Sequence, residues 1–248
     1  MRINRLILAA FVICLSFTAC DKLDTLPVPD LSNDEVVQGL KEALRVGTDT
    51  SVTTLHKEDG YFADQAVKIF LPPEAQVIKE NISLVPGGDQ LVEALIKKIN
   101  RSAEDAAVEA KPIFVDAITN ITITDGLNIL NGADTAATHY LKENTYNSLK
   151  DLFQPKIETS LSKPIIGGIS AQSSYASLVN IYNDAAKIKN LIPLGKQYAI
   201  VQDTSLSAYT TKRALSGLFL KIADEEKAIR TDPIARVTDI LKKVFSKQ

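Results

Sequence analysis

Cys20 is the residue whose type and position most clearly predict a chemical reaction. It follows an apolar run, residues 6–17, which Arg2 and Arg5 precede. A cationic start, a short apolar segment and small residues before a cleavage point are the parts of an export signal, whereas a membrane-spanning helix would need roughly 20 apolar residues. We therefore expect residues 1–19 to act as a signal peptide that is removed during export.

The tetrapeptide Phe17-Thr18-Ala19-Cys20 resembles the lipobox of bacterial lipoproteins, whose cysteine receives a diacylglycerol before the signal is removed. The new amino terminus is then acylated, and several acyl chains together hold a protein on a membrane where one chain would anchor only marginally. The resemblance predicts lipid attachment at Cys20 and a location in the cell envelope, on the inner or outer membrane and facing the periplasm. An ordinary secretory signal without a lipid is the alternative.

The composition predicts a folded domain and excludes a nucleic-acid-binding one. The chain has 28 basic and 30 acidic residues, whereas binding to nucleic acid usually requires a basic patch and a high pI. With 45% hydrophobic residues, the part after the signal can bury a substantial core. Cys14 lies within the signal, so cleavage would leave Cys20 as the only thiol and no disulfide within the chain could form. No cofactor is indicated.

Two pairs of residues have a spacing that is used in metal binding or catalysis, but neither predicts an active site. His139 and Glu143 lie four residues apart, yet a closed zinc site normally has four ligands, so a surface pair is expected. Ser160 and Lys163 have the spacing of serine acyl-enzymes, but the accompanying motifs are absent and Pro164 ends the helix. Phosphate-binding loops and dinucleotide fingerprints are also absent. We predict no catalytic residue and no metal ligand.

The remaining polar candidates could form a site only if folding brings them together. Asp134, Thr135 and Thr138 lie at the expected start of a helix, where free backbone amides can bind an anion. Capping of this helix by Asp134 or Thr135 is the simpler interpretation. Arg101 and Glu104 could form a buried network between helices.

The elements that must position these residues are predicted to be helices. Ser32 and Glu35 have the spacing of a capping box and open a long helix that ends at about His56. Within a later helix, Glu226 and Arg230 form an i, i+4 pair that a solvated face explains. Apolar periodicity and turn residues predict further helices over residues 73–85, 89–110, 124–132, 145–162, 170–189, 215–231 and 237–245, with Asp134 or Thr135 opening another and Pro155 disturbing the one over 145–162.

Two short segments, residues 121–124 and 198–201, alternate like strands but have no obvious partner. The predicted fold is therefore all-α: a single multi-helix domain over residues 32–248, with long amphipathic helices and at most minor β content. Residues 20–31, which contain Pro27 and Pro29, are expected to form a lipidated tether that reaches about 30 Å at roughly 3.1 Å per residue.

Several stretches of this chain resemble a family of bacterial envelope proteins known as domain of unknown function 4197. The resemblance implies a helical, exported and often lipid-anchored domain, and it carries no catalytic residues. The stretches that carry it are residues 39–48, Asn100-Arg101 with Ala103-Glu104, residues 110–114, 129–138, Gly217-Leu218-Phe219, residues 223–230 and Asp232-Pro233.

These observations leave the biochemical function open. We expect a membrane-anchored, non-enzymatic binding or scaffold domain that holds an envelope protein or an apolar ligand near the membrane. An envelope hydrolase that uses scattered carboxylates such as Glu104 and Asp134 is one alternative. A self-associating structural subunit is another, and it predicts a large exposed apolar patch, for example on the last helix.

Overall fold

The computed structural model describes residues 31–165, 167–202 and 205–245. The predicted signal peptide, Cys20 and nearly all of the tether lie outside the described residues. From Leu31 onward the chain forms one compact unit. Within the described residues this unit is helical and contains no strand, which confirms the all-α prediction.

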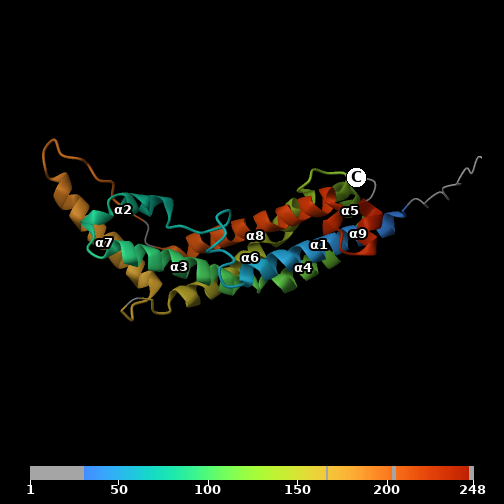
Figure 1. Cartoon of the computed structure of the whole chain (residues 1–248), viewed down its shortest axis with the longest axis horizontal. Coiled ribbons are helices and arrows are strands. Elements are labelled where there is room, and N and C mark those ends of the chain that lie inside the picture. Colours follow the sequence, from blue (N-terminus) through green and yellow to red (C-terminus); the bar gives the residue numbers. More distant parts are fainter. Residues whose placement is uncertain (1–30, 166, 203–204, 246–248) are drawn as a thin grey trace, which may run out of the picture. The chain divides into compact units, whose positions relative to one another are not determined.

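The structure begins with α1 (Asn33–His56), and the helices follow one another through short turns and two longer connections (Figure 1). In chain order the remaining elements are η1 (Pro73–Ala75), α2 (Gln76–Glu80), η2 (Ile82–Leu84), α3 (Gly88–Ala107), α4 (Ala110–Thr119), α5 (Ile123–Leu130), α6 (Ala136–Leu161), α7 (Ala171–Asn190), α8 (Leu206–Thr231), η3 (Pro233–Ala235) and α9 (Asp239–Phe245).

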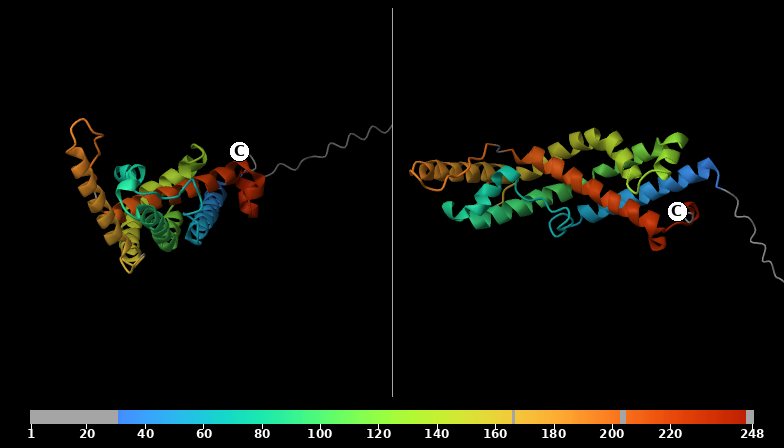
Figure 2. Two further views of the ribbon diagram at one scale, coloured as in Figure 1. Left: turned by 60° about the vertical axis from the view of Figure 1, so that its left-hand side comes forward. Right: turned by 90° about the horizontal axis from the view of Figure 1, so that it is seen from above.

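Four long helices, α1, α3, α6 and α8, pack on one another and enclose most of the core. Helices α4 and α5 cover α1 and α6, and α9 packs on α1. Helix α7 contacts α3, α8 and η2, and in both views of Figure 2 it lies at the end of this unit away from the start of α1. The central core includes Leu40, Leu44, Val52, Leu55, Leu95, Ile99, Leu149, Phe153, Ile157, Leu215, Leu218 and Ile222.

Helix α1 forms as its sequence predicts. The amide of Glu35 donates to the Ser32 hydroxyl (3.3 Å), and the amide of Ser32 donates to the Glu35 carboxylate (3.0 Å), so both halves of the capping box are present. The predicted apolar face is buried from Val36 to Leu55. This local agreement is expected where capping and amphipathicity favour the same helix.

Several helix boundaries differ from the prediction, and local hydrogen bonding explains two of them. The predicted helix over residues 73–85 is broken at Asn81, whose side-chain amide donates to the Val77 carbonyl and competes with the regular backbone pattern. Helix α5 is capped by Thr122, not at Thr124, through a second capping box with Asp125. The amide of Asp125 donates to the Thr122 hydroxyl (3.1 Å).

Two prolines lie inside helices without ending them. Pro112 occupies the first turn of α4, where its missing N–H is one of the amides that a helix start leaves unpaired. Pro155 lies on the exposed side of α6, and the helix continues through it to Leu161. The helix predicted over residues 89–110 therefore ends earlier, at Ala107, and Pro112 lies in the first turn of the next helix.

Residues 198–201, which alternate like a strand, form no strand, and asparagine side chains bind their backbone. Asn190 accepts from the amide of Tyr198 (2.8 Å) and donates to its carbonyl (2.9 Å). Asn183 makes the same pair of bonds with Val201 (3.0 and 2.8 Å). Both asparagines lie on α7, so this helix holds the segment without a sheet.

The last helix is buried, which contradicts the predicted apolar patch there. Leu241, Val244 and Phe245 are buried against α1 and α8 in a second, smaller cluster. Gly39 allows the close approach, since a Cβ at this position would lie 2.4 Å from Cγ2 of Val244. Lys243 also forms an ion pair with Glu35 (2.7 Å).

No single helix among the described residues is long and apolar enough to cross a membrane, and only the bent pair α4 and α5, at 104° to each other, meets these criteria together.

Candidate functional site

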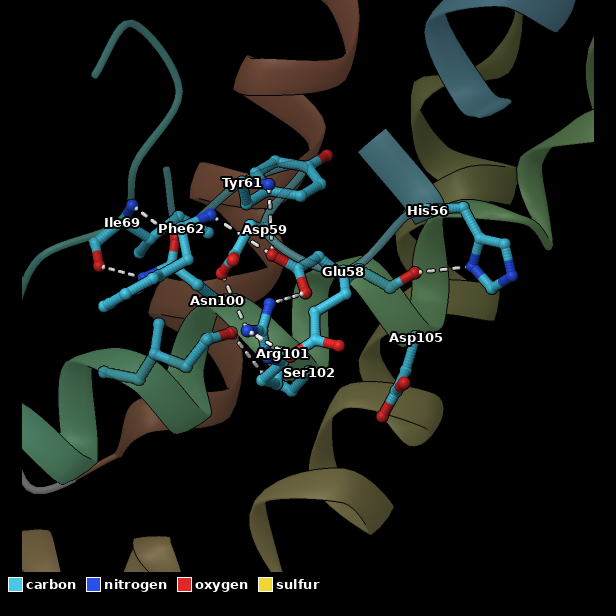
Figure 3. A network of polar contacts seen from close by, with 12 residues as sticks. His56, Glu58, Asp59, Tyr61, Phe62, Ile69, Asn100, Arg101, Ser102 and Asp105 are labelled. Carbon is cyan, nitrogen blue, oxygen red and sulfur yellow. Dashed lines mark hydrogen bonds and ion pairs between the residues drawn. The ribbon is translucent and has the colours of Figure 1, made fainter. Parts of the chain in front are cut away.

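Glu104 is the centre of the first polar network, which lies between α3 and the loop over residues 57–72 (Figure 3). Its side chain is almost fully buried, and its Oε1 atom accepts hydrogen bonds from the amides of Tyr61 and Phe62, both at 3.1 Å. The Arg101 guanidinium donates to Oε2 at 2.5 Å. The carboxylate therefore fixes the backbone of the loop to α3.

Arg101 connects this carboxylate to two acids at the surface. Its Nη2 atom lies 3.0 Å from the Glu58 carboxylate and 2.7 Å from that of Asp59. Asp59 has a φ of 68°, a left-handed conformation that a non-glycine residue seldom adopts. His56 Nδ1 donates to the carbonyl oxygen of Glu104 at 2.9 Å, which ties the end of α1 to the same turn of α3. We call these residues, with Glu104, Tyr61 and Phe62, the Glu104 network.

Two neighbouring contacts hold the rest of the loop. Asn100 accepts from the amide of Ile69 and donates to its carbonyl, each at 2.8 Å. Tyr61 is fully buried, and its hydroxyl donates to the Ala214 carbonyl on α8 (2.8 Å). Burial and the nearby Glu104 carboxylate raise the pKa of Tyr61. The loop is thus joined to α3 by side chains and to α8 by a buried ring.

A second network joins the ends of three helices around Glu226 of α8. The Glu226 carboxylate is buried and accepts from the amides of Ala137 (3.0 Å) and Thr138 (2.8 Å), and from the Thr138 hydroxyl (2.8 Å). These amides belong to the first turn of α6. A carboxylate at this position satisfies free donors and interacts favourably with the helix dipole.

Arg230, one turn further along α8, completes this second network. Its Nε and Nη2 atoms donate to Glu226 at 3.1 and 3.0 Å. Nη2 also donates to the carbonyl of Ile129 (3.0 Å) and Nη1 to that of Leu130 (3.3 Å), at the end of α5. We call Glu226, Arg230 and the groups that they bind the Glu226 network. It places a negative charge at the start of α6 and a positive charge at the end of α5.

The structure divides the five predicted polar candidates. Thr138 belongs to the Glu226 network, Arg101 and Glu104 belong to the Glu104 network, and Asp134 and Thr135 are exposed. The prediction that Asp134 or Thr135 caps α6 is wrong, because Thr135 makes no side-chain cap bond and the cap comes from α8. Among the described residues, no hydrogen bond or ion pair joins Glu104 to Asp134.

The interpretation of Glu226 and Arg230 as a solvated pair is also wrong, because α8 packs along α6 and both side chains are buried. The start of α6 was predicted to be able to bind an anion. The anion that it binds is the chain's own Glu226 carboxylate. Sequence reasoning missed the positioning role of Asn100, Asn183 and Asn190. Their signal was an amide on an otherwise apolar helical face, which needs a partner when it is buried.

The residues with the spacing of metal-binding or catalytic motifs are surface or structural groups. His139 and Glu143 form an exposed pair at 3.0 Å, as predicted. Ser160 is buried, and its hydroxyl lies 3.3 Å from the Lys98 ammonium and 2.9 Å from the Asp105 carboxylate. Burial lowers the pKa of Lys98, but a substrate could not reach this hydroxyl. In the part of the chain that the structure describes, no group of three His, Cys, Asp or Glu side chains could hold a metal ion.

One surface groove has the mixed lining of a binding site. It has a volume of about 400 Å³, within the usual range for small-molecule pockets. The Lys68 ammonium lies 4.1 Å from the centre of the Phe62 ring and 5.8 Å from that of Phe70. We call it the Phe70 groove, and its lining consists of Phe62, Lys68, Phe70, Lys79, Ile82, Asp89, Val92, Glu93 and Ile96.

Comparison with known proteins identifies a family but no characterised relative. A family model described as "Protein of unknown function (DUF4197)" matches residues 30–246. No curated protein and no solved structure shows a significant match.

Proposed function

The chain belongs to the family described as Protein of unknown function (DUF4197), and for this member we propose a non-enzymatic binding domain that a lipid on Cys20 holds on a membrane of the bacterial envelope. The domain would face the periplasm and bind an apolar ligand or a partner protein close to the bilayer. The membrane to which it is anchored is the inner or the outer one.

The use of the buried acids is the observation that carries the non-enzymatic part of this proposal. Among the described residues, Glu104 and Glu226 are the buried carboxylates. Each accepts two backbone amides and pairs with an arginine. A general acid or base needs a free position toward the substrate. These carboxylates have their oxygens occupied by the fold, which supports a structural role for both and weakens the hydrolase alternative.

The Phe70 groove supports the binding part. Its apolar lining comes from loop residues that the Glu104 network holds in place and from one face of α3. Phe70 itself is 40% exposed, although a large aromatic side chain gains free energy when it is covered. An apolar ligand in the groove would cover it, and Lys68 could interact with a polar end of that ligand.

Replacement of Phe70 tests the groove. We expect Phe70→Ser to weaken binding of N-phenyl-1-naphthylamine, an uncharged apolar fluorescent probe, about tenfold, because an aromatic contact surface is removed. The matched control is Leu220→Ser on α8, a residue of similar exposure (42%) that does not line the groove. Titration of the probe by fluorescence measures both affinities. Equal weakening by the two substitutions, or none by Phe70→Ser, would contradict a binding role for the groove.

Replacement of Cys20 tests the anchor. Cys20→Ser removes the thiol that would carry the diacylglycerol, so we expect complete loss of label when cells are grown with a clickable fatty acid. The same variant should move from the membrane fraction toward the soluble fraction or stay as an uncleaved precursor. Cys14→Ser is the matched control, because it lies within the predicted signal and should leave labelling intact. Labelling that persists in Cys20→Ser would contradict the proposal.

A further inference from the structure

The end of α7 and the turn that follows it carry a group of exposed apolar side chains, one of which, Leu194, is the most exposed large apolar residue among the described residues. Leu191 is 81% exposed and Leu194 is fully exposed. Ile188 and Ile192 beside them are also exposed. We call residues 187–196 the α7 tip. Single exposed apolar residues are common, but several gathered on one turn indicate a contact surface.

The charged residues within the α7 tip are all lysines. Residues 185–202 contain Lys187, Lys189 and Lys196 and no acidic residue, whereas the whole chain has a net charge of −2. All three lysines are exposed. Lys187 has only an exposed ion pair with Asp184 at 3.4 Å, which adds little free energy. The apolar tip is therefore bordered by ammonium groups that can meet an anionic surface.

The fold holds this tip in its exposed position. Asn190 binds the backbone of Tyr198 on both sides, which closes the turn over residues 191–197. Leu194 has a φ of 62°, a strained conformation for a residue with a side chain, and it points into solvent. Lys196 donates to the Asn81 side chain (2.8 Å), which joins the turn to the segment after α2. The apolar side chains are thus presented on a braced turn.

We propose that the α7 tip inserts into the surface of an anionic phospholipid membrane. The apolar residues lie on a turn, and a standard protein interface buries about 800 Å² on each partner, which a single turn does not offer. Interfacial membrane contacts need less: apolar side chains that reach about 5–10 Å into the boundary and basic residues at the level of the phosphates. The α7 tip supplies both.

This inference rests on the proposed location of the domain at a membrane and adds a second contact to it. The lipid on Cys20 would fix only the start of the chain, from which a tether leads to α1. In the described unit, α7 lies at the end away from the start of α1 (Figure 2). Insertion of the α7 tip would therefore restrict the orientation of the whole domain, which a single attachment at Cys20 cannot do.

A single tryptophan reports this insertion, because the chain contains none. The full-length chain carrying Leu194→Trp is reconstituted into vesicles that contain brominated phosphatidylglycerol, and quenching of tryptophan fluorescence is measured. The control is Ile234→Trp in η3, where the side chain is also strongly exposed (87%) and the one basic residue within three positions, Arg236, is buried. We expect quenching and a blue shift for Trp at 194, and neither for Trp at 234.

When brominated phosphatidylcholine replaces brominated phosphatidylglycerol, most of the quenching at position 194 should be lost. Lys187→Gln and Lys189→Gln should each lower the partition of the tip about fivefold, because each basic residue near an anionic surface strengthens its binding by about this factor. Equal quenching at both positions, or none at position 194 in a chain that floats with the vesicles, overturns the inference.

Flotation of the chain with vesicles distinguishes failure of tip insertion from failure of the lipid anchor. In the Cys20→Ser background, quenching that persists at position 194 supports the tip independently of the lipid. A chain that floats only with intact Cys20 and shows no quenching supports the anchor and contradicts the tip. A chain that neither floats nor is quenched in either background contradicts both proposals.

Discussion

Glu226→Ala is expected to destabilise the folded domain by about 3–5 kcal/mol, the usual cost of removing one partner from a buried ion pair. The substitution leaves the amides of Ala137 and Thr138 without their acceptor and removes the carboxylate that Arg230 binds at 3.0 Å. Arg230 would keep the carbonyls of Ile129 and Leu130 as acceptors but would lose the charge-assisted bonds to Glu226. Urea unfolding followed by circular dichroism measures the loss.

The control for this prediction is a pair with the same spacing at the surface. Glu143→Ala removes the i, i+4 partner of His139, and both side chains are mostly exposed, so the change should lie within about 0.5 kcal/mol. The double variant Glu226→Leu with Arg230→Met should recover part of the loss, because it removes both charges together. A loss below about 1 kcal/mol for Glu226→Ala would show that the pair does not hold the three helix ends.

The contrast between α1 and α6 shows how much of the fold the sequence can predict. The cap of α1 comes from Ser32 and Glu35, which are three residues apart, and the sequence predicts this helix start correctly. The cap of α6 comes from Glu226, 89 residues from the amide of Ala137. Local capping rules favoured the side chain of Asp134 or Thr135. The packing of α8 along α6 instead brings the Glu226 carboxylate to the first amides of α6.

The same limit applies to the predicted strand at residues 198–201. Its alternation indicated a strand, but the structure forms none there, and the backbone is bound by a pair of asparagine side chains on α7, seven residues apart. A helix rises about 1.5 Å per residue and an extended chain about 3.3 Å, so seven helical residues span almost the same length as three extended ones. The spacing of Asn183 and Asn190 therefore almost equals that of Val201 and Tyr198. A prediction from either segment alone cannot show this, because it depends on both segments.

The candidate site was predicted in part. Arg101 and Glu104 do form a partly buried network, but it joins α3 chiefly to a loop, whereas a network between helices was predicted. The sequence could not show that the amides of Tyr61 and Phe62 complete it, because backbone groups in a loop have no sequence signature. Their position depends on Asp59 in a left-handed conformation and on the Tyr61 ring against α8. The Glu104 carboxylate, which was a candidate for catalysis, is consequently occupied by backbone amides.

Glu104→Ala is expected to cost about 3 kcal/mol, since it leaves two buried amide donors unsatisfied and each costs about 1–3 kcal/mol. The effect should be smaller than that of Glu226→Ala, because Arg101 keeps Glu58 and Asp59 as partners. The loop over residues 57–72 should open locally, so hydrogen exchange at Tyr61 and Phe62 should rise by more than the change in global stability explains. Urea unfolding and exchange measured by mass spectrometry test the two effects separately.

Glu58→Ala is the matched control, because Glu58 pairs with the same guanidinium but its side chain is 80% exposed. It should change stability by less than about 0.5 kcal/mol and leave exchange at Tyr61 and Phe62 unaltered. Glu104→Gln should give an intermediate loss, because its amide oxygen can still accept from the loop while its NH₂ group faces Arg101 without an attractive charge. Phe70 belongs to this loop, so opening of the loop should also weaken binding of the apolar probe in the Phe70 groove. Equal effects of Glu58→Ala and Glu104→Ala would show that surface charge, not the buried acceptor, holds the loop.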